Sequence, residues 1–108
     1  MPRYLIQASY TNQGISDLVK SPQDRAAAVR PVIERLGGKL VTLDFAFGEY
    51  DVVGIGELPD NVAMAALSMA IGASGAFSEF KTTVLISMDE AVEAMRKAGT
   101  VGYRPPGR

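Results

Sequence analysis

The middle of the chain holds two short segments of strand-forming residues joined by a glycine-containing tetrapeptide, and this arrangement constrains the fold most. The segments read KLVTLDFAF at 39–47 and DVVGIGE at 51–57, with Gly48-Glu49-Tyr50-Asp51 at their junction. So close a spacing of two strand-like runs around a glycine-containing turn predicts an antiparallel hairpin. Any fold proposed for the chain must place this hairpin near its centre.

A helix is predicted on each side of the hairpin. The first is expected from SPQD at 21–24 to Gly37, with Ser21 as cap, Pro22 in the first position and Asp24 near the positive helix end. Pro31 lies inside this helix and predicts a kink, because proline removes one backbone hydrogen bond. The second helix is expected over 62–73, with Asp60 or Asn61 as cap.

Two further strands complete the pattern. RYLIQASY at 3–10 is predicted as a strand that runs into a loop, TNQGISD, and a fourth strand is predicted from about Phe77 to Ser87. A short helix over 88–98 follows. The order β-α-β-β-α-β predicts an α+β, ferredoxin-like plait with a four-stranded antiparallel sheet and a C-terminal helix. We expect one domain over residues 1–98 and an extended tail over 99–108.

The composition excludes several kinds of chemistry. The 108 residues include no Cys and no His, so disulfides, thiolate or imidazole catalysis and thiolate zinc sites are excluded within the chain. We therefore expect no metal and no cofactor. A net charge of -1 without a basic patch disfavours nucleic acid and membrane surfaces as partners. The N-terminus has no signal-peptide pattern, which makes a cytoplasmic location the expectation.

Strand alternation separates the two faces of the predicted sheet. The apolar face, expected under the helices, collects Tyr4, Ile6, Ala8, Val41, Leu43, Phe45, Val53, Ile55, Phe80, Val84 and Ile86. The mixed face collects Leu5, Gln7, Ser9, Thr42, Asp44, Ala46, Gly54, Gly56, Glu79, Lys81 and Thr83. These polar residues either point to water, as is common in antiparallel sheets, or line a ligand cavity beneath a second subunit. On the second alternative the ligand-binding residues are Gln7, Ser9, Asp44, Gly54, Glu79 and Lys81.

The second predicted helix favours self-association. No residue from Asn61 to Ser78 is charged, and two apolar stripes are present, Val62-Ala66-Met69 and Met64-Leu67-Ile71. One stripe can cover the sheet of its own subunit, whereas the other needs a partner. The expected partner is a second copy of the chain, in a homodimer or a higher homo-oligomer with this helix as a second interface.

The central tetrapeptide has two interpretations. Its carboxylates and phenol could form a catalytic cluster, but a hairpin turn is favoured, with Gly48 at positive φ, Glu49 in solvent and Asp51 accepting hydrogen bonds from turn amides. Tyr50 is expected to pack over the strand ends.

Taken together, SYTNQGI, SP, GGK, FGEYDVV and ELPD resemble the GYD domain proteins, a small bacterial family named for a Gly-x-Tyr-Asp signature. Gly48, Tyr50 and Asp51 match that signature. The resemblance implies a dimeric α/β barrel of the ferredoxin-like group, and it assigns no biochemical function.

Three functions are compatible with these observations. The first is a small-molecule-binding or regulatory oligomer with its ligand cavity between paired sheets. The second is a cofactor-independent isomerase or monooxygenase, in which Asp44, Glu79, Tyr10 or Tyr50 would transfer protons. The third is a structural assembly unit that associates through the outer stripe of the second helix.

Overall fold

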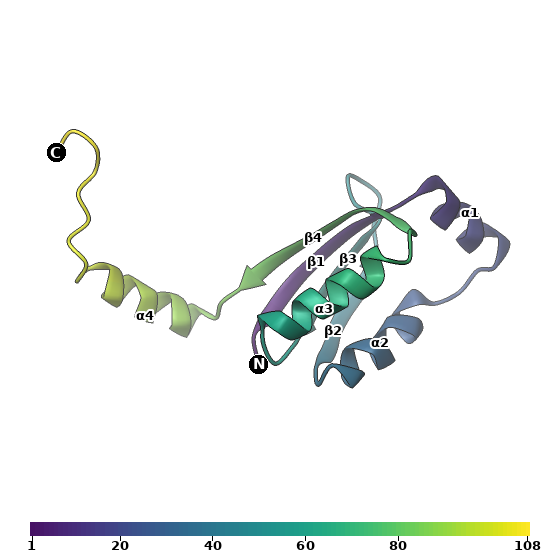
Figure 1. Cartoon of the computed structure of the whole chain (residues 1–108), viewed down its shortest axis with the longest axis horizontal. Helices are drawn as coiled ribbons and strands as arrows, with labels where there is room; N and C mark the ends of the chain where they lie inside the picture. Colours follow the sequence, from purple (N-terminus) through teal and green to yellow (C-terminus); the bar gives the residue numbers. More distant parts are fainter.

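The computed structural model describes residues 1–108 and contains four strands and four helices (Figure 1). Their bounds are β1 (Arg3–Tyr10), α1 (Asn12–Lys20), α2 (Arg25–Arg35), β2 (Lys39–Phe45), β3 (Val52–Glu57), α3 (Asn61–Gly72), β4 (Phe77–Leu85) and α4 (Met88–Ala98). The sheet has the order β2-β3-β1-β4, and all neighbouring strands are antiparallel. The α+β ferredoxin-like plait predicted from the sequence is therefore confirmed.

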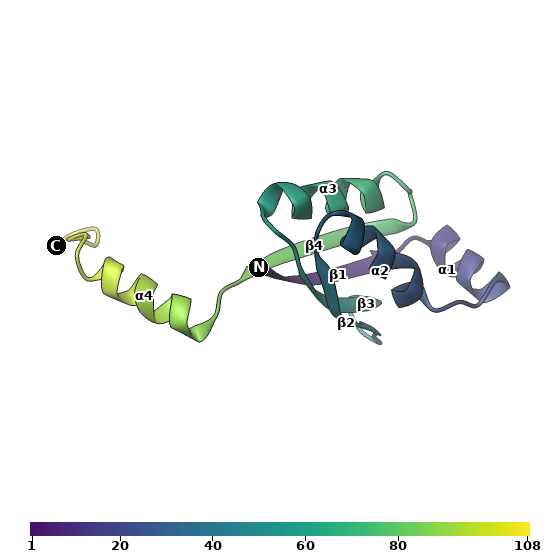
Figure 2. The ribbon, with the colours of Figure 1, turned by 90° about the horizontal axis from the view of Figure 1, so that it is seen from below.

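The core lies between one face of the sheet and the helices α2 and α3. Figure 2 shows both helices on the same side of the strands. The buried cluster consists of Tyr4, Ile6, Ile33, Leu40, Leu58, Met64 and Leu67. The phenol of Tyr4 is the polar group in this cluster, and its OH donates a 2.7 Å hydrogen bond to Asn61 Oδ1. This bond offsets the cost of burying a hydroxyl and ties β1 to the start of α3.

The beginnings of the first two helices differ from the predictions. A loop was predicted after β1, but α1 forms there because Thr11 caps it, its Oγ1 accepting a 3.0 Å bond from the Gly14 amide. Helix α2 begins at Arg25 rather than near Ser21, because the Asp24 side chain accepts from the amides of the first turn. The helix is continuous across Pro31, and the predicted kink stays a prediction.

The face assignment of β3 was wrong. Gly54 lies opposite the buried Ile6, and Gly56 lies opposite the buried Tyr4. Opposed residues in an antiparallel pair point to the same face, so both glycines lie under the helices. A Cβ at Gly54 would lie 2.7 Å from Leu43 Cδ1 and 2.8 Å from the Thr42 carbonyl oxygen, so glycine is needed for this close approach of β2.

Val53 and Ile55 accordingly point to the open face, although they were expected in the core. Their opposing residues in β1 are Gln7 and Leu5. A register shift between Leu40 and Thr42 in β2 also places Leu40 in the core and leaves Val41 exposed. The open face therefore has a more apolar centre than predicted.

Helix α4 stands apart from the rest of the molecule. Both views show α4 and the residues after it projecting beyond the end of β4 (Figures 1 and 2). The molecule measures 59 × 33 × 22 Å and has a radius of gyration of 17.5 Å. A compact chain of this length would have a radius of gyration of about 13 Å. The excess reflects this projecting segment.

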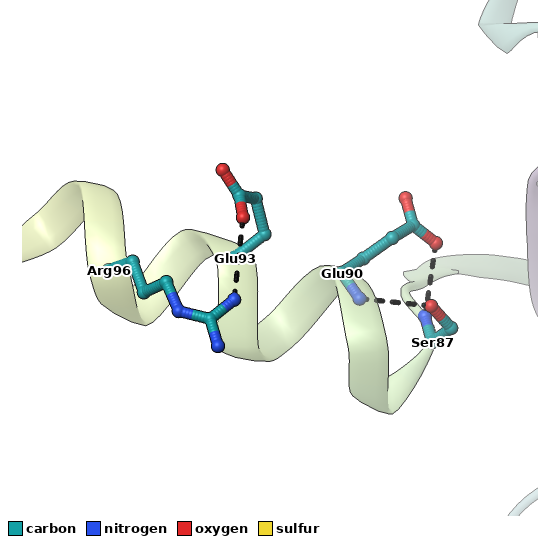
Figure 3. Close-up of polar contacts among 4 residues, drawn as sticks. All are labelled: Ser87, Glu90, Glu93 and Arg96. Atoms are coloured by element: carbon teal, nitrogen blue, oxygen red, sulfur yellow. Dashed lines mark hydrogen bonds and ion pairs between the residues drawn. The ribbon is translucent and has the colours of Figure 1, made fainter.

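The interactions that stabilise α4 are local ones within the helix and at its beginning. Ser87 and Glu90 form a reciprocal capping box at its beginning, and Glu93 pairs with Arg96 across 3.7 Å (Figure 3). None of the four helices combines the length and hydropathy needed to cross a membrane.

Candidate functional site

The open sheet face carries most of the residues predicted to bind a ligand. The pairings Asp44 with Val53, Val53 with Gln7, and Gln7 with Lys81 place these residues in one row across the sheet. Asp44 and Lys81 occupy the two edge strands, about 14 Å apart at the usual strand spacing. The row therefore has opposite charges at its ends, with the apolar Val53 and the polar Gln7 between them.

The other predicted residues lie beside this row or outside it. Ser9 pairs with Glu79 in the next row, and the Ser9 hydroxyl donates a 3.0 Å bond to the Glu49 carbonyl oxygen. The carboxylates of Asp44 and Glu79 and the amine of Lys81 are exposed. Gly54 lies on the opposite face and cannot contribute to this surface. In a single chain the face is an open surface, and its binding role stays a prediction.

The signature turn links the hairpin to β1. The Asp51 Oδ2 accepts a 2.9 Å bond from the Tyr10 amide, and the Asp51 amide donates a 2.9 Å bond to the Ala8 carbonyl oxygen. The Asp51 carboxylate therefore binds the end of β1 rather than turn amides, which corrects the prediction. Gly48 has the predicted positive φ, 159°, and Glu49 is exposed as predicted. The hairpin-turn interpretation is supported.

A cavity that the sequence did not reveal lies on the helix side of the sheet. It is partly open to solvent, has a volume of about 360 Å³, and lies among α1, α2, α3 and the adjoining ends of β1 and β4. Its apolar wall consists of Leu18, Val29, Val32, Leu67, Ile71 and Phe77, with small residues Gly14, Ala28, Ala70 and Ala76 between them. We call it the helix-side cavity.

Five polar side chains also line the helix-side cavity, namely Tyr10, Asp17, Gln23, Arg25 and Ser74. The guanidinium of Arg25 donates a 2.7 Å bond to Gln23 Oε1. Asp17 accepts a 2.8 Å bond from the side-chain amide of Gln13 in the preceding turn of α1. The cavity thus combines an apolar wall with a polar end, the name that we give to the linked side chains of Tyr10, Gln23 and Arg25, which carry one positive charge.

Tyr10 is the polar group most altered by this environment. Burial raises the pKa of Tyr10 above its usual value of 10.0, and the charge of the Asp51 carboxylate adds to this rise. The charge and hydrogen bonding of Arg25 lower the pKa of Tyr10 and so offset part of the rise. The phenol is therefore protonated at neutral pH. The protonated phenol carries an O–H group that can donate a hydrogen bond.

Aromatic rings fix the orientation of Tyr10. Its ring stacks on Phe77 at a centroid distance of 4.5 Å and on Phe45 at 6.3 Å, and Phe77 meets Phe80 edge-on at 6.3 Å. The row spans β2, β1 and β4. The capping residue Thr11 was the signal that could have found the cavity, because it predicts the helix α1 that closes one side.

Comparison with known proteins gives a single family. No curated protein matches the chain. A profile of the GYD domain matches residues 4–95, which takes in all of the sheet except Arg3, the helix-side cavity and most of α4. The chain, in which Gly48, Tyr50 and Asp51 form the signature turn, therefore belongs to the GYD domain family.

Proposed function

We propose that the protein binds a small molecule with an apolar body and an anionic end in the helix-side cavity. The observation that carries this proposal is the cavity itself, with its apolar wall and its polar end at Tyr10 and Arg25. Its volume of about 360 Å³ falls in the range of small-ligand pockets, which are lined mostly by apolar groups with a few oriented polar ones. A small aliphatic or aromatic carboxylate has the matching chemistry.

The polar end supports binding of an anion. Arg25 supplies a fixed positive charge and can bond a carboxylate with two parallel N–H groups. The protonated phenol of Tyr10 adds a neutral O–H donor in the same region. Asp17 also lines the cavity and would repel a second negative charge on the ligand, which favours a monoanion over a dianion.

The electrostatics favour binding over catalysis at this place. A general base should have a pKa near the working pH, whereas burial moves the pKa of Tyr10 further above it. Tyr10 therefore serves as a hydrogen-bond donor. The predicted ligand cavity between paired sheets is a separate location, which the apolar centre of the open face supports and a second chain would have to complete.

The test begins with a thermal-shift screen of small carboxylates, followed by calorimetric titration of each stabilising compound. Arg25→Gln should weaken binding roughly 10- to 100-fold, because a hydrogen bond to a charged group is worth about 1.5–3 kcal/mol. Ala70→Phe should abolish binding by filling the cavity. Arg30→Gln is the matched control, because it removes the same charge from an exposed position of α2 outside the cavity.

Two outcomes contradict the proposal. One is a screen in which no carboxylate stabilises the folded chain. The other is an equal loss of affinity in Arg25→Gln and Arg30→Gln. A loss confined to Asp44→Asn or Lys81→Met would overturn the helix-side location and place the ligand on the open sheet face.

A further inference from the structure

Helix α4 presents an apolar stripe that nothing in its own chain covers. Met88, Val92 and Met95 follow the i, i+4, i+7 spacing of one helix face, and their side chains are 82%, 43% and 67% exposed. The charged residues of the helix lie around the other faces: Asp89, Glu90, Glu93, Arg96 and Lys97. Such two-sided patterning is typical of a helix that packs against a protein surface.

The helix cannot obtain that packing within its own chain. It lies beyond the end of β4 in both views, and none of its residues belongs to the core (Figures 1 and 2). An isolated helix of 11 residues is marginal in water even with a good cap. Its stability must therefore come from a surface outside the chain.

The total surface of the chain indicates how large that outside surface is. The accessible area is 7,502 Å². A monomer of 11.5 kDa would expose about 5,800 Å². The excess is roughly 1,700 Å² per chain, so two chains that each bury it would form an interface of about 3,400 Å² in total. This falls in the class of permanent dimers.

The arm begins where the open face ends. Leu85 lies opposite Arg3 at the end of the open face, and the next residues are Ile86, 55% exposed, and then Met88 of the stripe. The half-buried Leu5, Val53 and Ile55 form the centre of the same face. One partner surface could cover both parts.

We propose that α4 is an exchange arm, which packs its Met88-Val92-Met95 stripe on the domain of a second copy of this chain. The arrangement is reciprocal, so that a two-fold axis relates the open faces and each arm grips the other domain. The occupant is a second copy because the excess area matches that of a permanent homodimer and because the arm follows directly on β4 at the end of the open face. This inference is independent of the ligand proposed for the helix-side cavity.

The first test compares Met95→Glu with Lys97→Glu by sedimentation equilibrium of the full chain. Both variants place a glutamate in the last turn of α4, but only Met95 belongs to the apolar stripe. Met95→Glu should raise the dimer dissociation constant on the order of 100-fold, because two buried methionine side chains are lost per dimer. Lys97→Glu should change it less than tenfold. A monomeric wild type at about 100 μM, or equal effects of the two variants, would overturn the proposal.

A second test uses the absence of cysteine from the chain. Met95→Cys introduces a single thiol, whose alkylation should slow at least tenfold at concentrations where the chain is dimeric. Alkylation that is fast and independent of concentration contradicts a packed arm. Ready oxidation to a disulfide-linked dimer would place the two arms against each other and overturn the assignment to the partner's domain.

Discussion

Asp51 shows how a single residue of the family signature acts on a distant part of the molecule. Its carboxylate accepts the Tyr10 amide at the point where the pairing of β1 with β4 shifts register between Ser9 and Tyr10. The aspartate thereby supplies an acceptor for a backbone amide at the end of the strand. The signature thus fixes the backbone of the residue whose phenol lies at the polar end of the helix-side cavity.

Tyr10 should make stability depend on alkaline pH. Because its pKa in the folded chain is raised above 10.0, the folded chain holds this proton more tightly than the unfolded chain does. The resulting stability is fully present below about pH 10 and is lost as the pH rises through the folded pKa. Urea unfolding between pH 8 and 12 should therefore show a smaller alkaline loss of stability in Tyr10→Phe than in wild type.

Two substitutions near Tyr10 should shift its pKa in opposite directions. The shift is measured by tyrosinate absorbance, and comparison with Tyr10→Phe identifies the part of the signal that comes from Tyr10. Asp51→Asn should lower the pKa of Tyr10, and Arg25→Gln should raise it, because each removes one of the charges that act on the phenol. Shifts in the same direction would contradict this account of the site.

Helices and strands that local sequence signals define were predicted correctly. Features that depend on how closely two distant segments pack were not. The bounds of α4 and the Asp60 cap of α3 follow from local sequence signals, and both are confirmed. The faces of β3 were misassigned because alternation places valine and isoleucine inward, whereas Gly54 is inward so that β2 can approach. The helix-side cavity was missed because Gly14 in TNQGISD indicates a loop, although Thr11 caps a helix there.

Substitution by alanine should lower the stability of the chain at Gly14 and raise it at Gly72. A Cβ at Gly14 would lie 2.6 Å from the Ala76 carbonyl oxygen, so the backbone must move and Gly14→Ala should lose about 1–3 kcal/mol of stability. A Cβ at Gly72 meets nothing within 4 Å, so Gly72→Ala should gain about 0.5–1 kcal/mol from helix propensity. Urea denaturation measures both. A stabilising Gly14→Ala would show that α1 does not pack against this carbonyl.

At the scale of the whole molecule, the sequence predicted the sheet and its helices but not the separation of α4 from them. The fold follows from element order, which local patterns record. The position of α4 depends on whether another surface of the same chain can pack against the apolar stripe of the helix. Local sequence patterns do not indicate this. The outer stripe of α3 is a further uncovered surface, since Val62 and Met69 are 78% and 73% exposed. Association through it, as predicted for a larger oligomer, stays a prediction.

Thermal stability should depend on protein concentration if a second copy completes the fold. Each tenfold dilution of a folded dimer that unfolds to monomers costs about 1.4 kcal/mol, so the midpoint of unfolding should fall on dilution. Calorimetry or circular dichroism from about 1 to 100 μM measures this. Met95→Glu should show a midpoint that is lower and less dependent on concentration. A wild-type midpoint that stays constant across the range would contradict a coupled dimer.

The central position of β1 has a consequence for biosynthesis. The first strand to be made pairs on one side with β3 and on the other with β4, and Arg3 finds its partner only at Leu85. Such long sequence separations slow folding, because distant segments must meet before the sheet can close. During translation β1 therefore keeps a free edge until the last strand emerges from the ribosome. In that interval the nascent chain would be most open to chaperones, and to strand pairing with its neighbours on the same message.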